Sequence, residues 1–547
     1  MVRRAFGRHV ECTTATKAVL SLLSGLIAAC GSGTSASIAE GNSDTPDAAV
    51  LDHAAPRVGG DAGRNSLDSA GSQDSTAAQS GGGTDSPSMP STHSLSSDDA
   101  ASSDGASALM MVDSGPLDPN EGPLQGTSAM VFPAPGAQGV CPDPPLRVTF
   151  ASPPTLGSSG AIRVYDASGA VGATVDMGAA MYTDTIGGIA FSLLRPVYVD
   201  GNDVVIYLAS HALGYGKTYS VTVDSGAVFG PGGAPLVVSD AASWRFSTAA
   251  AAPMSLSTLT VATNSSGGFC SIQGALDAIS ASGAAATVTL QPGKYHEIIH
   301  AASLNSVTLQ GVDRKATIVV ATNNNNMNPT TMTRSLVGID NSTGLVIDNL
   351  TIQNSTAQGG SQAEALRLQN CDKCIVRNAD IVSLQDTLLW SGRLYAENCY
   401  VAGNVDFVWG TGAAYFKNCE IRTLGRAGAI VQARNGASGY GYVFVDSKLT
   451  ADSNVSAQVL ARIDVSAYPA SHVAYINCTM GSFIAPAGWG VTGLGDTSQL
   501  RFWEYQSVDE SGNAIDTSQR APGSTQISAA QAMSMRDVSV VLSGWTP

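Results

Sequence analysis

Apolar and polar residues follow three different patterns along the 547 residues of the chain. Residues 30–125 are rich in Ser, Gly, Ala and Asp, and such a stretch buries too little apolar surface to offset the entropy of ordering. We expect a disordered linker there. Residues 126–250 contain short runs of β-branched and aromatic residues separated by Gly and Pro, which predict a small β-sandwich.

Residues 251–547 carry a repeat. Asn-Cys pairs stand beside β-type residues at 370/371, 398/399, 418/419 and 477/478, and Asp446-Ser447 lies between the last two. The cysteine intervals are 28, 20 and 59 residues, and Ser447 divides the last into 28 and 31. A small residue that recurs in this way predicts a parallel β-helix with coils of unequal length, in which the small residue points inward at one corner.

An amphipathic helix is expected at the start of this region. Ile272, Ala275, Leu276 and Ile279 recur with helical spacing after Ser271, a candidate N-cap. Its apolar face can cover the open end of the first coil, because an exposed solenoid edge needs a lid.

Four polar residues in three short phrases are the candidates for chemistry: Gln362, Gln385, Asp386 and Asp406. The two glutamines are 23 residues apart and the two aspartates 20 residues apart, and both separations are close to the length of one coil. All four residues therefore fall at similar positions on successive coils. Neighbouring coils lie about 4.8 Å apart. Two carboxylates at that separation cannot both ionise cheaply, which gives one acid and one nucleophile or base. The alternative is that both aspartates are turn residues at coil corners.

These phrases resemble the signature of the pectin methylesterases, or pectinesterases, and the resemblance covers about residues 260–547. Further matching phrases in chain order are residues 271–277, 293–297, 307–311, 432–434, 460–462, 486–489, 502–505 and 544–547. The resemblance implies an all-β protein with a right-handed parallel β-helix. Residues 213–219 and 244–247 resemble the bacterial immunoglobulin-like modules that accompany secreted enzymes, and we expect this module to be a spacer.

The resemblance also implies a role for each candidate residue. Asp406 is the nucleophile that attacks a methyl ester of galacturonate, and Asp386 is the general acid for the leaving methanol and then the base for water. Gln362 and Gln385 donate to the oxyanion. Arg462 pairs with Asp406 and keeps it ionised. The expected substrate is methyl-esterified homogalacturonan (pectin), and no cofactor or metal is implied.

Three residues depart from the family's phrases. Asp464 stands where the family has a tryptophan that stacks on the substrate, Trp409 replaces a more usual Phe, and Glu364 replaces an apolar residue. Asp464 brings a negative charge to the sugar subsites, and Trp409 offers stacking or simply a core ring. These changes favour, as an alternative, an esterase of the same fold that acts on a non-pectin ester.

Other functions fit the sequence less well. No Gly-x-Ser-x-Gly phrase is present, and no histidine lies in the central phrases, which argues against a serine triad. A polysaccharide lyase would need an acidic calcium-binding cluster, and none accompanies these phrases. A non-catalytic β-helix adhesin would leave the two aspartates and two glutamines unexplained.

The N-terminus predicts export. Residues 1–29 have a basic start and a short apolar run typical of a secretory signal peptide, and Ile27-Ala28-Ala29-Cys30 resembles a bacterial lipobox. We expect lipidation at Cys30 and a monomer tethered to the cell surface or outer membrane; a plain signal peptide with a chance cysteine is the alternative. Residues 31–125 carry 14 acidic and 2 basic residues and residues 251–547 carry 21 and 17, so nothing is basic enough for nucleic acid.

Seven cysteines remain beyond Cys12 and Cys30, so at least one has no partner within the chain. Cys371 and Cys374 have the spacing of a metal or redox pair, but no second pair or histidine cluster completes a zinc site. Stacked buried thiols or one disulfide are expected instead.

Overall fold

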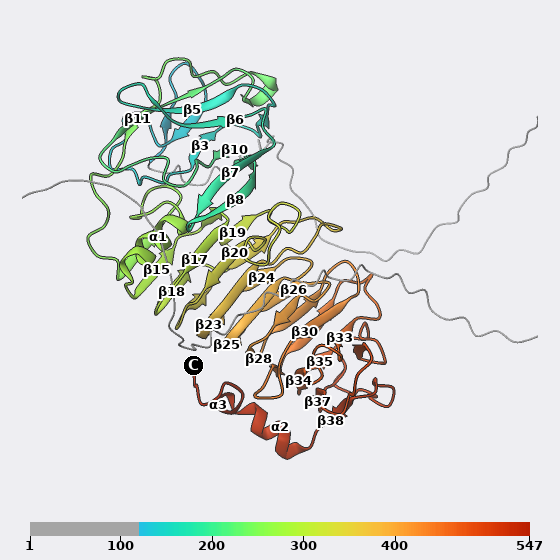
Figure 1. Ribbon diagram of the computed structural model, residues 1–547. Helices are drawn as coiled ribbons and strands as arrows, with labels where there is room; N and C mark the ends of the chain where they lie inside the picture. The colour runs from blue at the N-terminus through green and yellow to red at the C-terminus, as the bar shows by residue number, and fades with distance from the viewer. Residues whose placement is uncertain (1–119) are drawn as a thin grey trace, which may run out of the picture. The chain divides into compact units, whose positions relative to one another are not determined.

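The computed structural model describes residues 120–547 of the protein (Figure 1). The predicted signal peptide, Cys30 and nearly all of the predicted linker lie outside the described residues. No helix within the described range is long and apolar enough to cross a membrane. Antiparallel strands occupy the chain up to Ser247, and parallel strands follow from Thr258 onward.

Two antiparallel sheets form the first part and share one apolar core, which includes Val148 and Val204 of one sheet and Val164 and Val221 of the other. The sheets are β1 (Gly122–Pro123), β2 (Met130–Phe132), β3 (Leu146–Thr149), β10 (Asp203–Ile206) and β9 (Val197–Asp200), and β13 (Arg245–Ser247), β11 (Thr218–Val223), β5 (Ala161–Asp166) and β6 (Val171–Asp176). Two further pairs are β4 (Thr155–Leu156) with β12 (Val228–Phe229), and the hairpin β7 (Met181–Ile186) with β8 (Ile189–Leu194); a 3-10 helix spans Pro231–Gly233. A β-sandwich was predicted here, and its immunoglobulin-like kinship stays a prediction.

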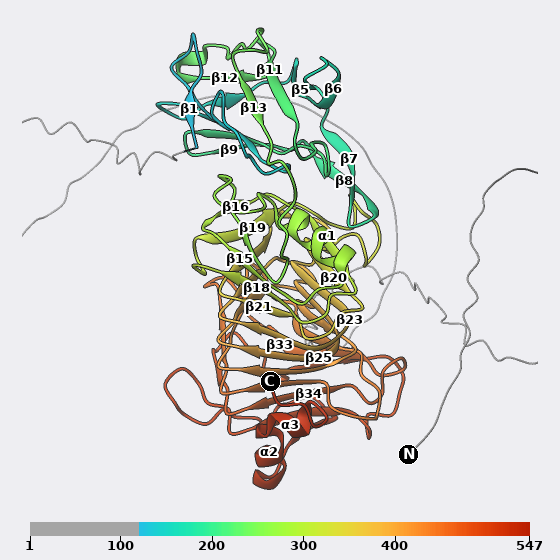
Figure 2. The same ribbon diagram turned by 90° about the vertical axis from the view of Figure 1, so that its left-hand side faces the viewer.

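The second part is a parallel β-helix, as predicted, whose strands lie one above another in three ladders (Figures 1 and 2). The first ladder is β14 (Thr258–Val261), β15 (Ala286–Leu290), β18 (Val307–Gly311), β21 (Val346–Asp348), β23 (Leu366–Arg377), β25 (Leu388–Glu397), β28 (Ala413–Lys417), β31 (Tyr442–Val445), β34 (His472–Ile476), β37 (Arg501–Tyr505) and β38 (Ser524–Gln526). The second is β17 (Ile299–Ala302), β20 (Val337–Asp340), β27 (Val408–Gly410), β30 (Ala429–Ala433), β33 (Val459–Asp464) and β36 (Trp489–Thr492), joined through β23 and β25. The third is β16 (Gly293–Tyr295), β19 (Thr317–Ala321), β22 (Thr351–Asn354), β24 (Asp380–Val382), β26 (Tyr400–Gly403), β29 (Glu420–Thr423), β32 (Lys448–Ala451) and β35 (Thr479–Met480).

One corner of the β-helix is built from left-handed residues followed by small buried ones. Asn378, Asn398, Asn418, Asp446 and Asn477 have φ between 51° and 55°, a region that Asn and Asp tolerate well. Each donates its backbone N–H to a carbonyl of the next coil. The residues that follow them are at most 2% exposed: Ala379, Cys399, Cys419, Ser447 and Cys478. The predicted inward position of the small residue is therefore confirmed.

The first Asn-Cys pair of the predicted repeat does not belong to this corner. Cys371 lies within β23, between the residues that pair with β20 and those that pair with β21. Asn378-Ala379 takes the corner position instead, and the Asn398 side chain of the next coil donates to that of Asn378. The first coil of the repeat is therefore shorter than the Asn-Cys pairs predicted. The prediction was wrong because β23 runs through two ladders without a break, and its bend happens to contain an Asn-Cys pair.

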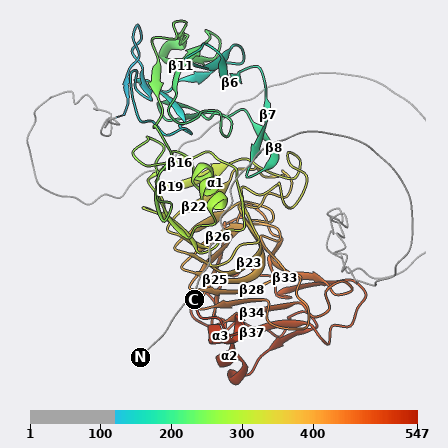
Figure 3. The same cartoon turned by 60° about the vertical axis from the view of Figure 1, so that its left-hand side comes forward.

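Helices lie at both ends of the β-helix (Figure 3). α1 (Ile272–Ser282) begins at Ser271, whose side chain accepts from the Gly274 N–H, and it ends at Gly283 with φ of 67°. All four predicted apolar residues of α1 are buried, which confirms the helix and its face. At the other end, α2 (Ala529–Arg536) and α3 (Val538–Val541) bury Met535 and Val541 against β31 and β34.

The sandwich and the β-helix are joined by more than the chain between them. Cys141 and Cys270 form a disulfide, and the Asp143 carboxylate accepts from the backbone N–H groups of Cys270 and Ser271, at 3.1 and 2.8 Å. The hairpin β7–β8 contributes Ile186 and Phe191 to the core of the β-helix. These contacts make the first part a structural partner of the second and not only a spacer.

The remaining cysteines of the described chain, Cys371, Cys374, Cys399, Cys419 and Cys478, are free and buried. In residues 120–547, Cys141, Asp143 and Cys270 are the only His, Cys, Asp or Glu side chains grouped closely enough for a metal ion. The disulfide occupies both sulfur atoms, so this group does not form a metal site.

Candidate active site

The three strands at the centre of the β-helix begin in register. β23, β25 and β27 pair through their first residues, Leu366 with Leu388 and Leu388 with Val408. A carboxylate stands just before each of these starts, at the same offset: Glu364, Asp386 and Asp406. We call these three residues the carboxylate row.

Backbone hydrogen bonds continue the ladder beneath the row. The N–H of Asp386 donates to the carbonyl of Val405 at 3.0 Å, and the N–H of Ala365 donates to that of Thr387 at 2.8 Å. Successive members of the row therefore stand one coil apart, which is about 4.8 Å in a parallel ladder. The sequence predicted this neighbourhood for the two aspartates, and the structure brings them together with Glu364 as a third member.

Both aspartates adopt left-handed backbone conformations, with φ of 66° at Asp386 and 49° at Asp406. They are 6% and 5% exposed. Left-handed non-glycine residues are uncommon, and where they persist the surrounding structure enforces them, often at functional sites. Both aspartates lie at the turn between the third ladder and the second, so the alternative of turn residues at a coil corner describes their backbone as well.

Arg462 holds the last carboxylate of the row. Its Nε donates to Oδ1 of Asp406 at 2.7 Å, and its Nη2 donates to Oδ2, so the guanidinium binds the carboxylate in the two-pronged manner typical of arginine. The Arg462 side chain is 50% exposed, whereas that of Asp406 is 7% exposed. The predicted pairing of Arg462 with Asp406 is present.

Arg334 holds the other two carboxylates, and it was not among the predicted site residues. Its Nη2 donates to Glu364 at 2.8 Å and to Oδ2 of Asp386 at 3.0 Å, and its Nε donates to both oxygens of Glu364 at 3.0 Å. Arg334 lies in a loop between ladders, well before Glu364 in the chain, and no phrase of the sequence connects the two. The signal for Glu364 was its separation from Asp386, which is close to the length of one coil.

Glu364 is completely buried. Burial raises the pKa of its carboxyl group above the usual value, and the neighbouring Arg334 opposes that shift. The row and its partners thus hold three carboxyl groups against two guanidinium groups. One retained proton makes the cluster neutral, which is the charge state that burial favours.

The two glutamines lie next to the row. Gln385 immediately precedes Asp386 and forms a parallel bridge with Val405, and the Gln362 carbonyl accepts from the N–H of Asn325 at 2.9 Å. Both residues are partly buried. Gln362 and Gln385 thus stand on neighbouring coils beside the aspartates, as the spacing predicted.

Trp409 lies on β27, and two cations approach its ring. The guanidinium carbons of Arg334 and Arg434 lie 5.7 and 4.7 Å from its ring centroid. Arg434 also donates to Oε1 of Gln432 at 2.6 and 3.0 Å. Trp409 is 7% exposed, so most of its surface packs against its neighbours.

Asp464 is exposed at the end of β33, two positions after Arg462. Its carboxylate accepts from the N–H and the hydroxyl of Ser466 at 2.9 and 2.5 Å. These hydrogen bonds hold the pKa of Asp464 below its usual value. Asp464 therefore closes a turn at the exposed end of β33, two residues after Arg462.

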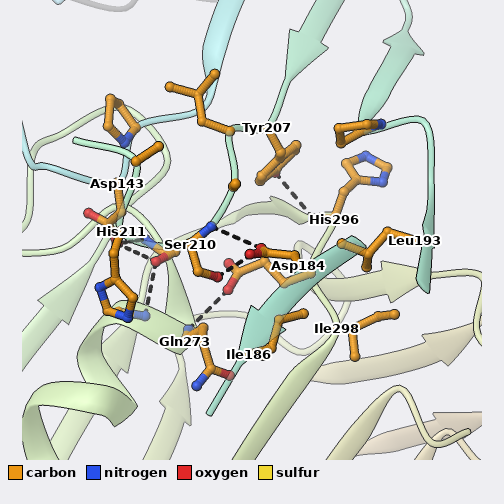
Figure 4. A pocket seen from close by; sticks show the side chains of 18 of the residues that line it. Asp143, Asp184, Ile186, Leu193, Tyr207, Ser210, His211, Gln273, His296 and Ile298 are labelled. Atoms are coloured by element: carbon orange, nitrogen blue, oxygen red, sulfur yellow. Dashed lines mark hydrogen bonds between the residues drawn. The ribbon is translucent and has the colours of Figure 1, made fainter. Parts of the chain in front are cut away.

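A cavity of about 570 Å³ lies elsewhere, between the sandwich and the start of the β-helix (Figure 4). Ile186, Leu193, Tyr207 and Ile298 are among its lining residues, and Glu297 caps α1 there by accepting from two backbone N–H groups. Burial raises the pKa of Glu297 to about 7. None of the predicted site residues lines this cavity, so it is separate from the carboxylate row.

A parallel β-helix that holds neighbouring carboxylates and adjacent amides is a carboxylate-based candidate active site, and comparison with known proteins gives the family. Residues 258–540 match the model of the pectinesterase family, which covers more than half of the chain. The chain therefore belongs to the pectinesterase family, and it is a carboxylic ester hydrolase.

Individual relatives are similar over the same region. Pectinesterase 31 of Arabidopsis thaliana is 26% identical over 281 residues, which are 49% of this chain and 86% of the relative. A probable pectinesterase A of Neosartorya fischeri is 27% identical over 51% of this chain and 86% of its own. Among solved structures, pectin methylesterase from carrot is 23% identical with a TM-score of 0.48, over 54% of this chain and 95% of that one.

Proposed function

We propose that this protein hydrolyses methyl esters of homogalacturonan and releases methanol, with Asp406 as the nucleophile. The observation that carries the proposal is the carboxylate row, in which Asp386 and Asp406 occupy equivalent positions on neighbouring coils with different partners. Membership of the pectinesterase family and the names of the relatives support the substrate.

The different partners support different roles for the two aspartates. A carboxylate that Arg462 binds through both oxygens stays ionised and oriented, so Asp406 can attack the ester carbonyl carbon. In the proposed first step a bond forms between Asp406 and that carbon, and the bond to the methoxy group breaks. Asp386 transfers its proton to the departing methoxy oxygen, which leaves as methanol.

The proposed second step reverses the role of Asp386. Now ionised, it takes a proton from water, and the hydroxide attacks the acyl-enzyme, which releases the free acid and returns Asp406 to its carboxylate form. The side-chain amides of Gln362 and Gln385 are the proposed donors to the oxyanion of both steps, since they flank the row on neighbouring coils.

The test is methanol release from highly methylated pectin by the purified protein, with Asp406→Asn as the matched blank. The change is nearly isosteric, so the fold is expected to persist while methanol release falls at least a thousandfold, in line with the loss of an activated nucleophile. Full activity in Asp406→Asn contradicts the assignment.

A second candidate keeps the mechanism and changes the ester. Asp464 is exposed and ionised where the family has a stacking tryptophan, and a negative charge there disfavours a polyanionic chain. A folded protein that hydrolyses a small neutral ester such as p-nitrophenyl acetate but releases no methanol from pectin would favour this candidate.

We also propose that the protein is exported and tethered to the cell surface by a lipid on Cys30, with residues 31–125 as the tether. The support is the basic start, the short apolar run and the lipobox-like phrase. Cys30→Ser is expected to abolish incorporation of radiolabelled palmitate and to release the protein from the membrane fraction. Unchanged labelling of Cys30→Ser rules out this anchor.

A further inference from the structure

We propose that Glu364 and Arg334 form a positioning pair that fixes the orientation of Asp386 and sets the pH at which Asp386 loses its proton. The inference rests on the proposed function of Asp386 as general acid. Neither member of the pair was among the predicted site residues.

Geometry links the pair to the acid. One guanidinium nitrogen of Arg334, Nη2, donates to Glu364 at 2.8 Å and to Asp386 at 3.0 Å, so this nitrogen links the two carboxyl groups. The side chains of Arg334, Glu364 and Asp386 are 7%, 0% and 9% exposed. Charges held this far from water interact more strongly than surface charges.

The charge of the pair explains why Asp386 can keep a proton beside an arginine. A lone guanidinium in contact with a carboxyl group favours its anion, which would spoil Asp386 as an acid. Arg334 donates to both oxygens of Glu364 and favours its ionised form against the effect of burial, so Glu364 supplies a compensating negative charge one coil away. Arg367, the other cation that acts on Glu364, is itself paired with Asp340 at 2.8 Å. With Glu364 present, the net charge that Asp386 meets from this pair is close to zero.

The loop of Arg334 is built to keep the guanidinium in place. The Asn323 side chain donates to the carbonyls of Thr333 and Ser335, on either side of Arg334, at 2.8 and 2.7 Å. Asn328 donates to Asn323 at 2.7 Å and exchanges two hydrogen bonds with the backbone of Ser192 in β8. The hairpin of the sandwich thus supports the loop that presents Arg334 to Asp386.

The decisive measurement is the pH profile of kcat/KM for methanol release by the full chain carrying Glu364→Gln. Loss of the negative charge leaves Arg334 unbalanced, so the pKa of Asp386 falls and the alkaline limb moves to lower pH by about one unit. An alkaline limb that stays in place or moves to higher pH overturns the proposal, because a merely structural role lowers activity equally at every pH.

The double variant Glu364→Leu/Arg334→Met removes both charges and keeps the site testable if the single variant does not fold, since apolar replacement of a buried ion pair is generally tolerated. Its kcat is expected to fall about tenfold, because Asp386 loses one contact that positions it. KM should be unchanged, and the alkaline limb should stay close to that of the wild type. An unchanged kcat overturns the proposal.

Asp380→Asn is the matched control. Asp380 is a carboxylate of the third ladder, 3% exposed, and it accepts from Nε of Arg314 at 2.8 Å. Its loss should leave the pH profile unchanged. Full activity of Asp386→Asn would instead show that the proposed function itself is wrong, which separates that failure from a failure of the pair.

Discussion

The two ends of the carboxylate row are held by the same kind of contact in different surroundings. At the inner end Arg334 and Glu364 are almost completely buried, and at the outer end the Arg462 side chain is half exposed around a buried Asp406. A buried pair is strongly coupled to its neighbours and costly to break, whereas a half-exposed arginine can hold a carboxylate and still leave it accessible. The difference suits the proposed roles, in which Asp386 is a fixed acid and Asp406 a nucleophile that substrate must reach.

The largest effect should separate the roles of the two aspartates. Asp386→Asn is expected to reduce hydrolysis of a methyl ester at least a thousandfold, because methoxide is a poor leaving group without a proton. On p-nitrophenyl acetate, whose leaving group needs no proton, the same variant should lose far less activity in the acylation burst. Asp406→Asn should lose both reactions, and stopped-flow release of p-nitrophenol measures the difference. Equal losses for both variants on both esters would contradict the assignment.

The next effect concerns stability. Arg334→Ala leaves Glu364 buried without its ion pair and should reduce the free energy of unfolding by about 3–5 kcal/mol. Arg462→Ala removes a partner that is half exposed, so water can take its place beside Asp406 and the loss should be smaller, about 1 kcal/mol. Urea unfolding followed by circular dichroism compares the two variants directly. Similar losses would mean that the two ends of the row do not differ in the way that their exposure indicates.

The smallest effect is expected at Asp464. Asp464→Asn removes an exposed negative charge two residues from Arg462, so KM for the anionic polymer should fall about twofold to threefold at low ionic strength. The gain should vanish at high salt, where exposed charges are screened. Ser466→Ala is the matched control, because it removes one hydrogen bond of the same turn and keeps the charge. An effect that persists at high salt would point to a change in the turn instead.

Much of this fold was predictable because its signals are local. The short β-type runs noted in residues 126–250 include residues 162–165 and 219–223, which lie within β5 and β11, and the helix after Ser271 begins where its cap and apolar spacing indicate. The C-terminal helix α2 was not among the predicted elements, although the capping box of Ser528 and Gln531 is a local signal for it.

The site residues were predictable where the length of a coil alone brings them next to one another. Asp386 and Asp406 are separated by the length of one coil, so their register followed from the sequence. Arg334 could not be found in this way, because it reaches the row from a loop whose path depends on Asn323, Asn328 and the distant Ser192. The same limit explains the misplaced Asn370-Cys371 pair, whose position depends on where β23 bends.

The unequal coils of the β-helix have a consequence for how such a protein can change over evolutionary time. The corner residues Asn378, Asn398 and Asn418 are evenly spaced, whereas the coils that lead to Asp446 and Asn477 are longer, yet the strands stay paired. Insertions and deletions between ladders therefore alter what surrounds the row without shifting its members. Gain or loss of a whole coil within residues 364–406 would instead separate groups that must act together, so this short stretch is where length is least free to vary.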